Sequence, residues 1–227
     1  MKNFQTNIVP AYGQNPNNVY LFDNKNAKVR ILFVGNSITK HSPRPEIGWN
    51  NDCGMAASSV EKDYVHLTVK KIAEKYDESL AFGIAQVAEF ERNFSDMKLD
   101  EVYHDLKDFK PNIVIMFFGA NVSKEYDKTE NPVKKFGDAY EDLRNYINFD
   151  NSTEFFHSDG FYIRPVLDKE KFEVAEKYND VYINLKDIRE REDTHGKFNH
   201  PGDVGMAAIA ERFFENIEPA LKKITNK

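Results

Sequence analysis

Hydrophobic residues in this 227-residue chain gather in short apolar runs that are separated by longer amphipathic stretches. β-branched and aromatic runs of this length are typical of strands buried on both faces of a parallel sheet. The pattern predicts strands in VRILFV (29–34), SLAFGIA (79–85), NIVIMFFG (112–119), EFFHSDGFYIR (154–164) and DVYINL (180–185). Within 154–164, either the first or the second aromatic group can carry the strand.

The stretches between these runs carry apolar residues at helical spacing. Ser58 and Glu61 have the spacing of a capping box, and they open a helix over residues 60–76 that keeps its lysines on the polar face. Further helices are expected over residues 99–109, over 131–147 behind Pro132, over 172–178 and over 203–223.

Strands that alternate with helices along one chain favour an α/β fold. We therefore predict a three-layer α/β/α sandwich with a five-stranded parallel sheet. Residues 1–26 are rich in Asn, Pro and Gly and are predicted to form an irregular N-terminal arm. Residues 27–227 contain no internal repeat and are predicted to form a single domain, a size that can bury one core.

Composition narrows the possible functions. The formal net charge is −6 with both signs interspersed, so no basic patch predicts binding to nucleic acid or to a membrane. Cys53 is the single cysteine, which excludes an internal disulfide and a cysteine-based zinc site and favours a reducing, cytoplasmic location. No histidine pair has metal-site spacing. The N-terminal segment lacks the apolar core of a signal peptide, and no run approaches the roughly 20 apolar residues of a membrane span.

Three polar motifs are expected to meet at one edge of the sheet, because ligands of open α/β sheets bind beyond the carboxyl ends of the strands. Gly35-Asn36-Ser37 follows the first strand, Gly119-Ala120-Asn121 follows the third, and His200 precedes the last helix. A serine hydroxyl becomes a nucleophile when a base takes its proton, and the resulting oxyanion needs preorganised donors. A serine, a histidine and an amide are the minimum set for that chemistry.

The motifs VGNSIT, FFGANV and HPGDVGMAAIA resemble those of the SGNH hydrolases, also called GDSL esterases and lipases, in order and spacing. The resemblance covers most of the chain and implies a flavodoxin-like topology. It implies that Ser37 is the nucleophile and an oxyanion donor through its backbone, that Asn121 beside Gly119 is a second oxyanion donor, and that His200 is the general base. It also suggests a small-molecule ester substrate, such as an acetylated carbohydrate, and no metal or organic cofactor.

The chain departs from the family pattern at two of these motifs. Asn36 stands where the family often has Asp, and Lys197 occupies the usual position of the triad acid, three residues before the histidine. A lysine cannot orient a protonated imidazole. Either a carboxylate from elsewhere, such as Asp193 or Asp187, takes the role, or the enzyme works as a Ser-His dyad whose ring is held by a backbone carbonyl.

The family's second block supplies a backbone N–H to the oxyanion hole, and here that block is GIAQVAEFERNF. Its glycine, Gly83, lies too far inside the predicted strand to be an obvious equivalent. Since the site needs only a backbone N–H, the donor can be Ala85, Gln86 or Val87.

Two further segments flank the expected site. The loop IGWNNDCGMAAS places Trp49 and Met55 between the nucleophile and the first helix. They either form a wall of the substrate pocket or pack over the end of the sheet. Glu91 and Arg92 follow the second strand and either pair beneath the site or face solvent, and a structural role is favoured.

Two classes of function fit these residues. The first is a serine ester hydrolase, and the second is a flavodoxin-like domain that binds a small molecule at the same edge with weak catalysis or none, as the missing acid would allow. A nucleotide-binding domain is not favoured, because GNSITK lacks the spacing of a phosphate-binding loop. Reactivity of Ser37 toward an organophosphonate separates the two classes, whereas the sequence specifies neither the acyl group nor the oligomeric state.

Overall fold

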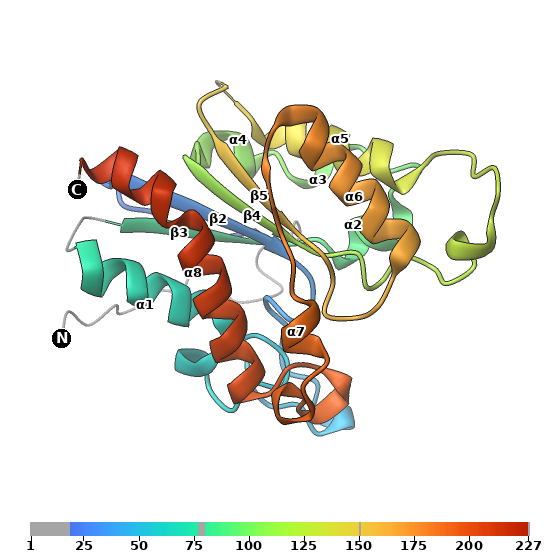
Figure 1. Cartoon of the computed structure of the whole chain (residues 1–227), viewed down its shortest axis with the longest axis horizontal. Coiled ribbons are helices and arrows are strands. Elements are labelled where there is room, and N and C mark those ends of the chain that lie inside the picture. Colours follow the sequence, from blue (N-terminus) through green and yellow to red (C-terminus); the bar gives the residue numbers. More distant parts are fainter. Residues whose placement is uncertain (1–18, 77–79, 150, 227) are drawn as a thin grey trace.

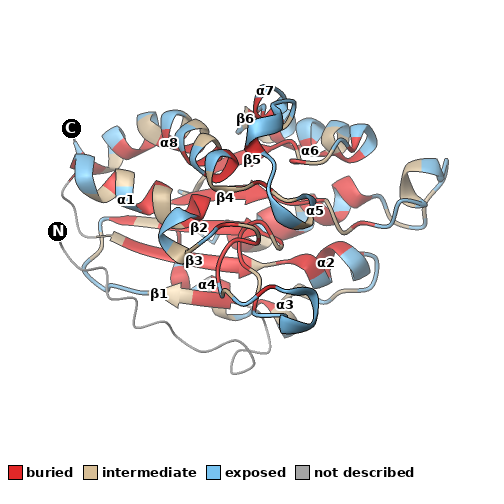
Figure 2. Ribbon diagram, turned by 90° about the horizontal axis from the view of Figure 1, so that it is seen from below, coloured by how far each residue is buried: buried red, intermediate tan, exposed pale blue. Residues whose placement is uncertain are grey.

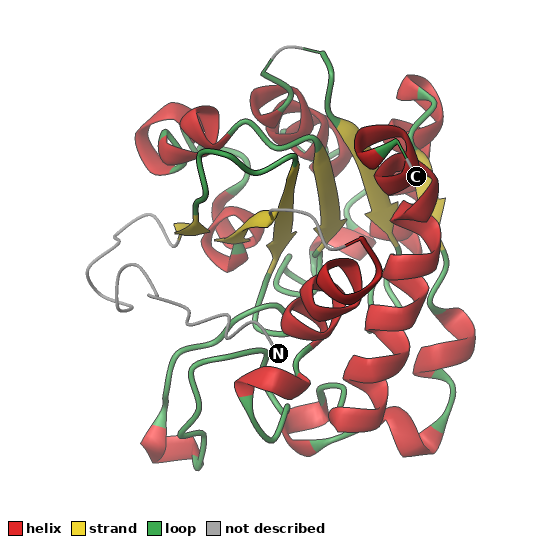
Figure 3. Cartoon of the chain, turned by 90° about the vertical axis from the view of Figure 1, so that its left-hand side faces the viewer, coloured by secondary structure: helices red, strands yellow, loops and turns green. Residues whose placement is uncertain are grey.

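The computed structural model describes residues 19–76, 80–149 and 151–226, in which the strands form one six-stranded sheet of order β1-β3-β2-β4-β5-β6. Helices lie on both sides of the sheet (Figure 1; Figure 3). Five strands run parallel, and β1 pairs antiparallel with β3 at one edge. The strands are β1 Val19–Phe22, β2 Val29–Gly35, β3 Leu80–Gln86, β4 Ile113–Phe117, β5 Glu154–Ser158 and β6 Val181–Ile183.

Two hydrophobic cores fill the spaces between the sheet and the helices. Helices α1 and α8 pack on one face, and α2, α4, α5 and α6 contribute buried side chains to the other. The inner sides of these helices are buried and their outer sides exposed, as Figure 2 shows. The helices are α1 Tyr64–Tyr76, α2 Ala88–Asn93, α3 Leu99–Val102, α4 Asp105–Phe109, α5 Phe136–Ile147, α6 Pro165–Tyr178, α7 Lys186–Arg189 and α8 Asp203–Thr225.

The predicted three-layer sandwich and its five parallel strands are confirmed. Within 154–164 the first aromatic group carries the strand, because Phe155 and Phe156 enter the cores on opposite faces of the sheet. The segment predicted as one helix over 99–109 divides into α3 and α4, where Tyr103 turns its ring into the core and its backbone leaves the helical region.

Part of the predicted irregular arm is a strand. Val19 and Tyr20 lie on opposite faces of β1 and are buried in the two cores, and the strand pairs with β3 along its whole length. Four residues are too few for a periodic pattern to stand out among the surrounding Asn and Pro. Residues 1–18 of the predicted arm lie outside the described residues, and the division into arm and domain stays a prediction.

The helix predicted over residues 131–147 begins later, at Phe136. Its first N–H groups find acceptors on distant side chains, since Phe136 N–H donates to Tyr126 Oη at 2.7 Å and Gly137 N–H donates to Glu170 Oε2 at 2.7 Å. The start of α5 is thus set by tertiary contacts rather than by a local proline.

The register of the sheet brings the predicted motifs to one edge. Gly35, at the end of β2, lies opposite Gln86 of β3 and Phe117 of β4. Two loops far apart in sequence, near residues 45 and 197, also lie side by side below α7, blue and orange in Figure 1, where the rings of Trp49 and Phe198 pack edge to face. Among the described helices, none combines the length and the apolar character needed to cross a membrane.

Candidate active site

Ser37 lies in a tight turn directly after β2. The N–H groups of Thr39 and Lys40 donate to the Asn36 carbonyl at 2.9 and 3.0 Å. A side chain at Gly35 would overlap Thr39, because its Cβ would lie only 1.7 Å from Thr39 Oγ1. Glycine is therefore required before this turn. Ser37 itself is half-buried at the carboxyl end of the strand.

The structure brings Ser37 and His200 together. Ser37 Oγ lies 2.7 Å from His200 Nε2, although 163 positions separate the two residues in sequence. His200 lies three residues before Asp203, the first residue of α8, and Asp203 accepts from Ser58 N–H and Ser58 Oγ at 2.8 and 2.7 Å. These bonds join the histidine segment to the loop that follows the nucleophile.

The other ring nitrogen of His200 faces a backbone carbonyl. His200 Nδ1 is 2.7 Å from the Phe198 carbonyl oxygen and 3.1 Å from Tyr162 Oη. Because a carbonyl can only accept, Nδ1 carries the proton and Nε2 presents its lone pair to the Ser37 hydroxyl. The histidine is thereby held in the tautomer that a general base requires.

The Phe198 carbonyl reaches the ring through an unusual backbone conformation. Phe198 and Asn199 both have positive φ, 59° and 58°, in the left-handed region that costs a non-glycine residue about 1–2 kcal/mol. The Phe198 ring packs edge to face on buried Trp49, with centroids 6.3 Å apart, and Trp49 Nε1 donates to the His41 carbonyl at 3.2 Å. Trp49 thus supports the strained turn that orients the histidine.

The carboxylates considered as triad acids lie elsewhere. Both oxygens of exposed Asp193 accept from Arg191, at 3.0 and 2.7 Å, and Asp187 Oδ2 accepts from Arg212 at 2.7 Å. The structure therefore does not bring Asp193 to His200. The geometry matches the other alternative inferred from the sequence, a dyad whose imidazole is held by a backbone carbonyl.

Burial lowers the pKa of His200 below its usual value, the hydrogen bond to the Phe198 carbonyl raises it in part, and nearby His41 lowers it further. Burial is the largest of these effects. A neutral His200 is therefore favoured, and a neutral imidazole is the form that accepts the serine proton.

We expect the acid limb of kcat/KM to have its midpoint below pH about 6.5, the ordinary histidine value. Activity falls as pH drops through the pKa of His200, because the protonated ring cannot accept a proton, and a lowered pKa moves this fall to more acidic pH. Stopped assays of p-nitrophenyl acetate hydrolysis across the acidic range give the midpoint. A midpoint above the ordinary value would contradict the dominance of burial.

Asn121 lies in the turn after β4, beside the turn that carries Ser37. Its Nδ2 donates to Glu91 Oε2 at 2.5 Å, and Gly119 N–H donates to Glu91 Oε1. Gly119 has a φ of +130°, a conformation that favours glycine. The sequence left Glu91 and Arg92 either paired beneath the site or facing solvent. The structure places Glu91 fully buried beneath this turn, whereas Arg92 is exposed and forms an ion pair with Glu89.

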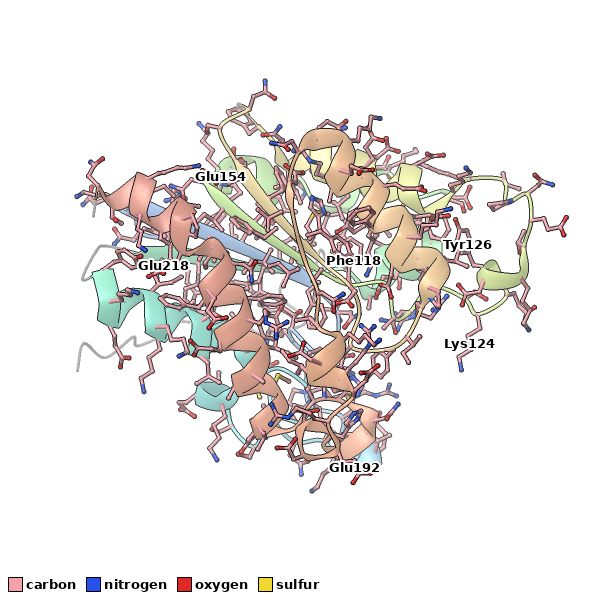
Figure 4. The ribbon with its side chains drawn as sticks, viewed as in Figure 1. Phe118, Lys124, Tyr126, Glu154, Glu192 and Glu218 are labelled. Carbon is pink, nitrogen blue, oxygen red and sulfur yellow. The ribbon has the colours of Figure 1, made fainter. Side chains whose placement is uncertain are left out.

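A buried lysine, Lys171, also anchors the end of β4. Phe118, which is buried and is labelled in Figure 4, accepts at its carbonyl oxygen from Lys171 Nζ at 3.2 Å. The same ammonium donates to the Ser158 carbonyl at 3.0 Å and forms an ion pair with Asp168 at 2.8 Å. This ammonium ties the ends of β4 and β5 together next to the Asn121 turn.

The residues considered as second backbone donors lie at the end of β3. Ala85 is buried inside the sheet, opposite Val19 and Val34. The side chain of Gln86 accepts at Oε1 from Ala88 N–H at 2.9 Å. Val87 N–H already donates to the Gly35 carbonyl at 2.7 Å. A role for Ala85 or Gln86 in the oxyanion hole stays a prediction.

Met55, like Trp49, is buried and secures the loop after the nucleophile. Met55 N–H donates to the Ser37 carbonyl at 2.8 Å, and its side chain joins the core beneath α8. Both residues therefore have the structural role considered for them, and their contribution to a substrate pocket stays a prediction.

No protein-family model matches the sequence, and no curated protein does. Solved structures do match. An active-site mutant of a family two carbohydrate esterase from Clostridium thermocellum superposes with a TM-score of 0.60 and 16% identity, covering 87% of this chain and 65% of that chain. A protein assigned to the G-D-S-L family of lipolytic proteins, from Desulfitobacterium hafniense, gives 0.53 and 14%, covering 82% and 98%. A lipase from a goat rumen metagenome gives 0.52 and 15%, covering 82% and 95%.

These likenesses define the fold. The chain has the fold of GDSL-like lipases and family two carbohydrate esterases, so the SGNH hydrolase fold predicted from the motifs is confirmed. At 14–16% identity, the activity of these proteins does not transfer with the fold. This chain spans about two thirds of the length of the Clostridium esterase chain.

Proposed function

We propose that this protein is a serine ester hydrolase that cleaves a small acyl ester, with Ser37 as nucleophile and His200 as general base. The observation that carries the proposal is the 2.7 Å contact between Ser37 Oγ and His200 Nε2, in the tautomer fixed by the Phe198 carbonyl. A serine that only caps a turn needs no imidazole lone pair. The esterases and lipases that share the fold support the reaction class.

In this mechanism, Ser37 Oγ attacks the ester carbonyl carbon while its proton passes to His200 Nε2. The oxyanion is stabilised by the Ser37 N–H and by the Asn121 amide. His200 then protonates the departing alcohol, which leaves the acyl group on Ser37. A water molecule, deprotonated by His200, attacks the acyl carbon, and the serine leaves with the returned proton as the acid is released.

The Phe198 carbonyl keeps the imidazole oriented through both halves of the reaction, because Nδ1–H donates to it whether the ring is neutral or protonated. A neutral carbonyl stabilises the imidazolium less than a carboxylate would. The enzyme is therefore expected to turn over more slowly than one with a triad acid, and its proposed chemistry needs neither metal nor organic cofactor.

An acetylated carbohydrate is the proposed substrate class. Support comes from the fold neighbours, among them a family two carbohydrate esterase from Clostridium thermocellum in complex with cellohexaose, which matches 89% of this chain with a TM-score of 0.56. Release of acetate from acetylated oligosaccharides tests this part. Hydrolysis of simple aryl acetates without acetate release from any acetylated sugar would contradict it.

The reaction class is tested with the purified chain by hydrolysis of p-nitrophenyl acetate and butyrate and by labelling with a fluorophosphonate probe. Mass spectrometry of the labelled protein should place the probe on Ser37. Hydrolysis together with labelling supports the proposal. Absence of both would overturn it and favour a domain that binds a small molecule at the same edge.

Replacing Asn121 with alanine should lower kcat by about a hundredfold or more, because it removes a donor to the oxyanion. The substitution also removes the donor to Oε2 of buried Glu91, so the melting temperature should fall, and kcat is compared at a temperature at which the variant is still folded. Steady-state hydrolysis of p-nitrophenyl acetate measures the effect. Asn93→Ala, an exposed asparagine on α2, serves as the control, and an unchanged kcat in Asn121→Ala would remove Asn121 from the oxyanion site.

A further inference from the structure

Glu91 is a carboxylate enclosed beneath the candidate site. Its side chain is 0% exposed, although it follows the end of β3 on the short helix α2. A carboxylate removed from water is costly unless hydrogen bonds replace its hydration. The hydrogen-bond donors around Glu91 therefore indicate its role in the site.

Four N–H groups donate to the Glu91 carboxylate. Asn36 Nδ2 lies 3.0 Å from Oε1, which also accepts from Gly119 N–H and, at 3.3 Å, from Asn121 N–H. Asn121 Nδ2 donates to Oε2 at 2.5 Å. All four donors are amide N–H groups, so both oxygens of the Glu91 carboxylate act as acceptors. Hydrogen bonds to a carboxylate are charge-assisted and therefore stronger than those between two neutral groups.

From this geometry we propose that Glu91 is the positioning residue of the oxyanion site: its buried carboxylate fixes the place and the orientation of the Asn121 amide and links it to the nucleophile turn. The proposal rests on the ester hydrolase function proposed above. Glu91 does not touch the reacting atoms and acts through Asn121.

The orientation of the Asn121 amide follows from the chemistry of its two neighbours. A carboxylate can only accept, so the nitrogen of the amide must face Glu91. Arg92 Nη2, which can only donate, lies 3.4 Å from Asn121 Oδ1 on the other side. An amide nitrogen carries two hydrogens, so Nδ2 can donate one to Glu91 and the other to a bound oxyanion.

The same carboxylate sets the separation between nucleophile and oxyanion donor. Asn36 directly precedes Ser37, while Gly119 and Asn121 belong to the neighbouring turn after β4, and all three donate to Glu91. Donors in an oxyanion hole must lie about 3 Å from the oxygen that forms when the serine attacks. The Glu91 carboxylate accepts from both turns and so fixes the distance between Ser37 and the Asn121 amide.

Glu91→Gln tests the proposal because it keeps the size of the side chain. Its single oxygen can replace one carboxylate oxygen, but its NH₂ group then faces either the Asn121 amide nitrogen or the backbone N–H groups, which are all donors. We expect kcat for p-nitrophenyl acetate to fall about tenfold or more with KM nearly unchanged. Glu89→Gln is the matched control, since Glu89 is exposed on the same helix and should keep the wild-type kcat.

A double-mutant cycle separates positioning from general support of the fold. If Glu91 acts through Asn121, then Glu91→Gln in the Asn121→Ala background should lower kcat no further. A tenfold loss in both backgrounds would overturn the proposal, as would wild-type kcat in Glu91→Gln. Melting temperatures of the four proteins exclude unfolding as the cause.

A readout without catalysis keeps this inference distinct from the proposed function. The side-chain amide signals of Asn121, assigned by their loss in Asn121→Ala, should exchange slowly with solvent in the wild type and much faster in Glu91→Gln. Equal exchange in both proteins would overturn the positioning role even if the enzyme is active. Slow exchange in a protein that neither hydrolyses esters nor reacts with the fluorophosphonate would overturn the proposed function and leave the anchoring of Asn121 by Glu91 standing.

Discussion

Replacing Ser37 with alanine should lower kcat for p-nitrophenyl acetate by about 10⁴-fold or more and abolish fluorophosphonate labelling. The hydroxyl is the atom that would form the acyl-enzyme, and without it His200 can activate only water. The Ser37 hydroxyl contacts His200 at the polar edge of the sheet, and the side chain belongs to neither core. The melting temperature should therefore stay near that of the wild type.

Ser42→Ala is the matched control for this result. Ser42 follows the nucleophile in the same loop, and its buried hydroxyl has no hydrogen-bond partner among the described residues, so its removal should leave activity and stability intact. If Ser37→Ala kept more than about one hundredth of the wild-type kcat, the covalent mechanism proposed for Ser37 would be wrong.

Strand prediction from the sequence works best where both faces of a strand are buried. In β4 successive residues alternate between the two cores, so every position from Ile113 to Phe117 is apolar. Strand β1 gives no such signal, because it is a four-residue edge strand within a polar segment. The start of α5 depends on acceptors from Tyr126 and Glu170, which no local pattern at residues 131–147 contains.

The candidate site divides in the same way. Ser37, Asn121 and His200 could be predicted because each lies in a short local motif. Their hydroxyl, amide and imidazole groups are the ones that nucleophilic catalysis by serine requires. A backbone carbonyl was one of two partners that the sequence offered for His200, but the particular carbonyl, that of Phe198, could not be predicted, because positive φ at a phenylalanine followed by an asparagine has no signature in the sequence. The contact from Tyr162 to the same ring nitrogen was missed for a similar reason, since Tyr162 lies in a loop after β5 with no motif around it.

Glu91 shows why a charged residue is hard to interpret from sequence alone. In FERNF it looks the same whether it faces solvent or the interior. Its burial results from the convergence of α2 with the turns that carry Asn36 and Asn121, and that convergence exists only once the sheet has assembled. The two asparagines donate to this carboxylate, so the asparagine at position 36, a departure from the family pattern, fits the acceptor beside it.

Replacing His200 with alanine should also lower kcat by about 10⁴-fold or more, because no other described group lies within hydrogen-bond distance of the Ser37 hydroxyl to take its proton. The double variant Ser37→Ala/His200→Ala should be no slower than either single variant. Nucleophile and base act as one unit, so once either is removed the other has no step left to accelerate. Steady-state hydrolysis of p-nitrophenyl acetate by the three variants measures this non-additivity.

His195→Gln controls for disturbance of the loop. His195 is exposed in the same segment, and its Nε2 lies 2.8 Å from the Arg189 carbonyl, a bond that glutamine can also donate. This variant should keep kcat within about threefold of the wild type. Two results would show that Ser37 and His200 do not form a catalytic pair. One is a reduction of kcat in the double variant equal to the product of the two single reductions, and the other is a reduction of less than about tenfold in His200→Ala. In that case, the 2.7 Å contact between them would be a structural hydrogen bond that closes the loop over the sheet.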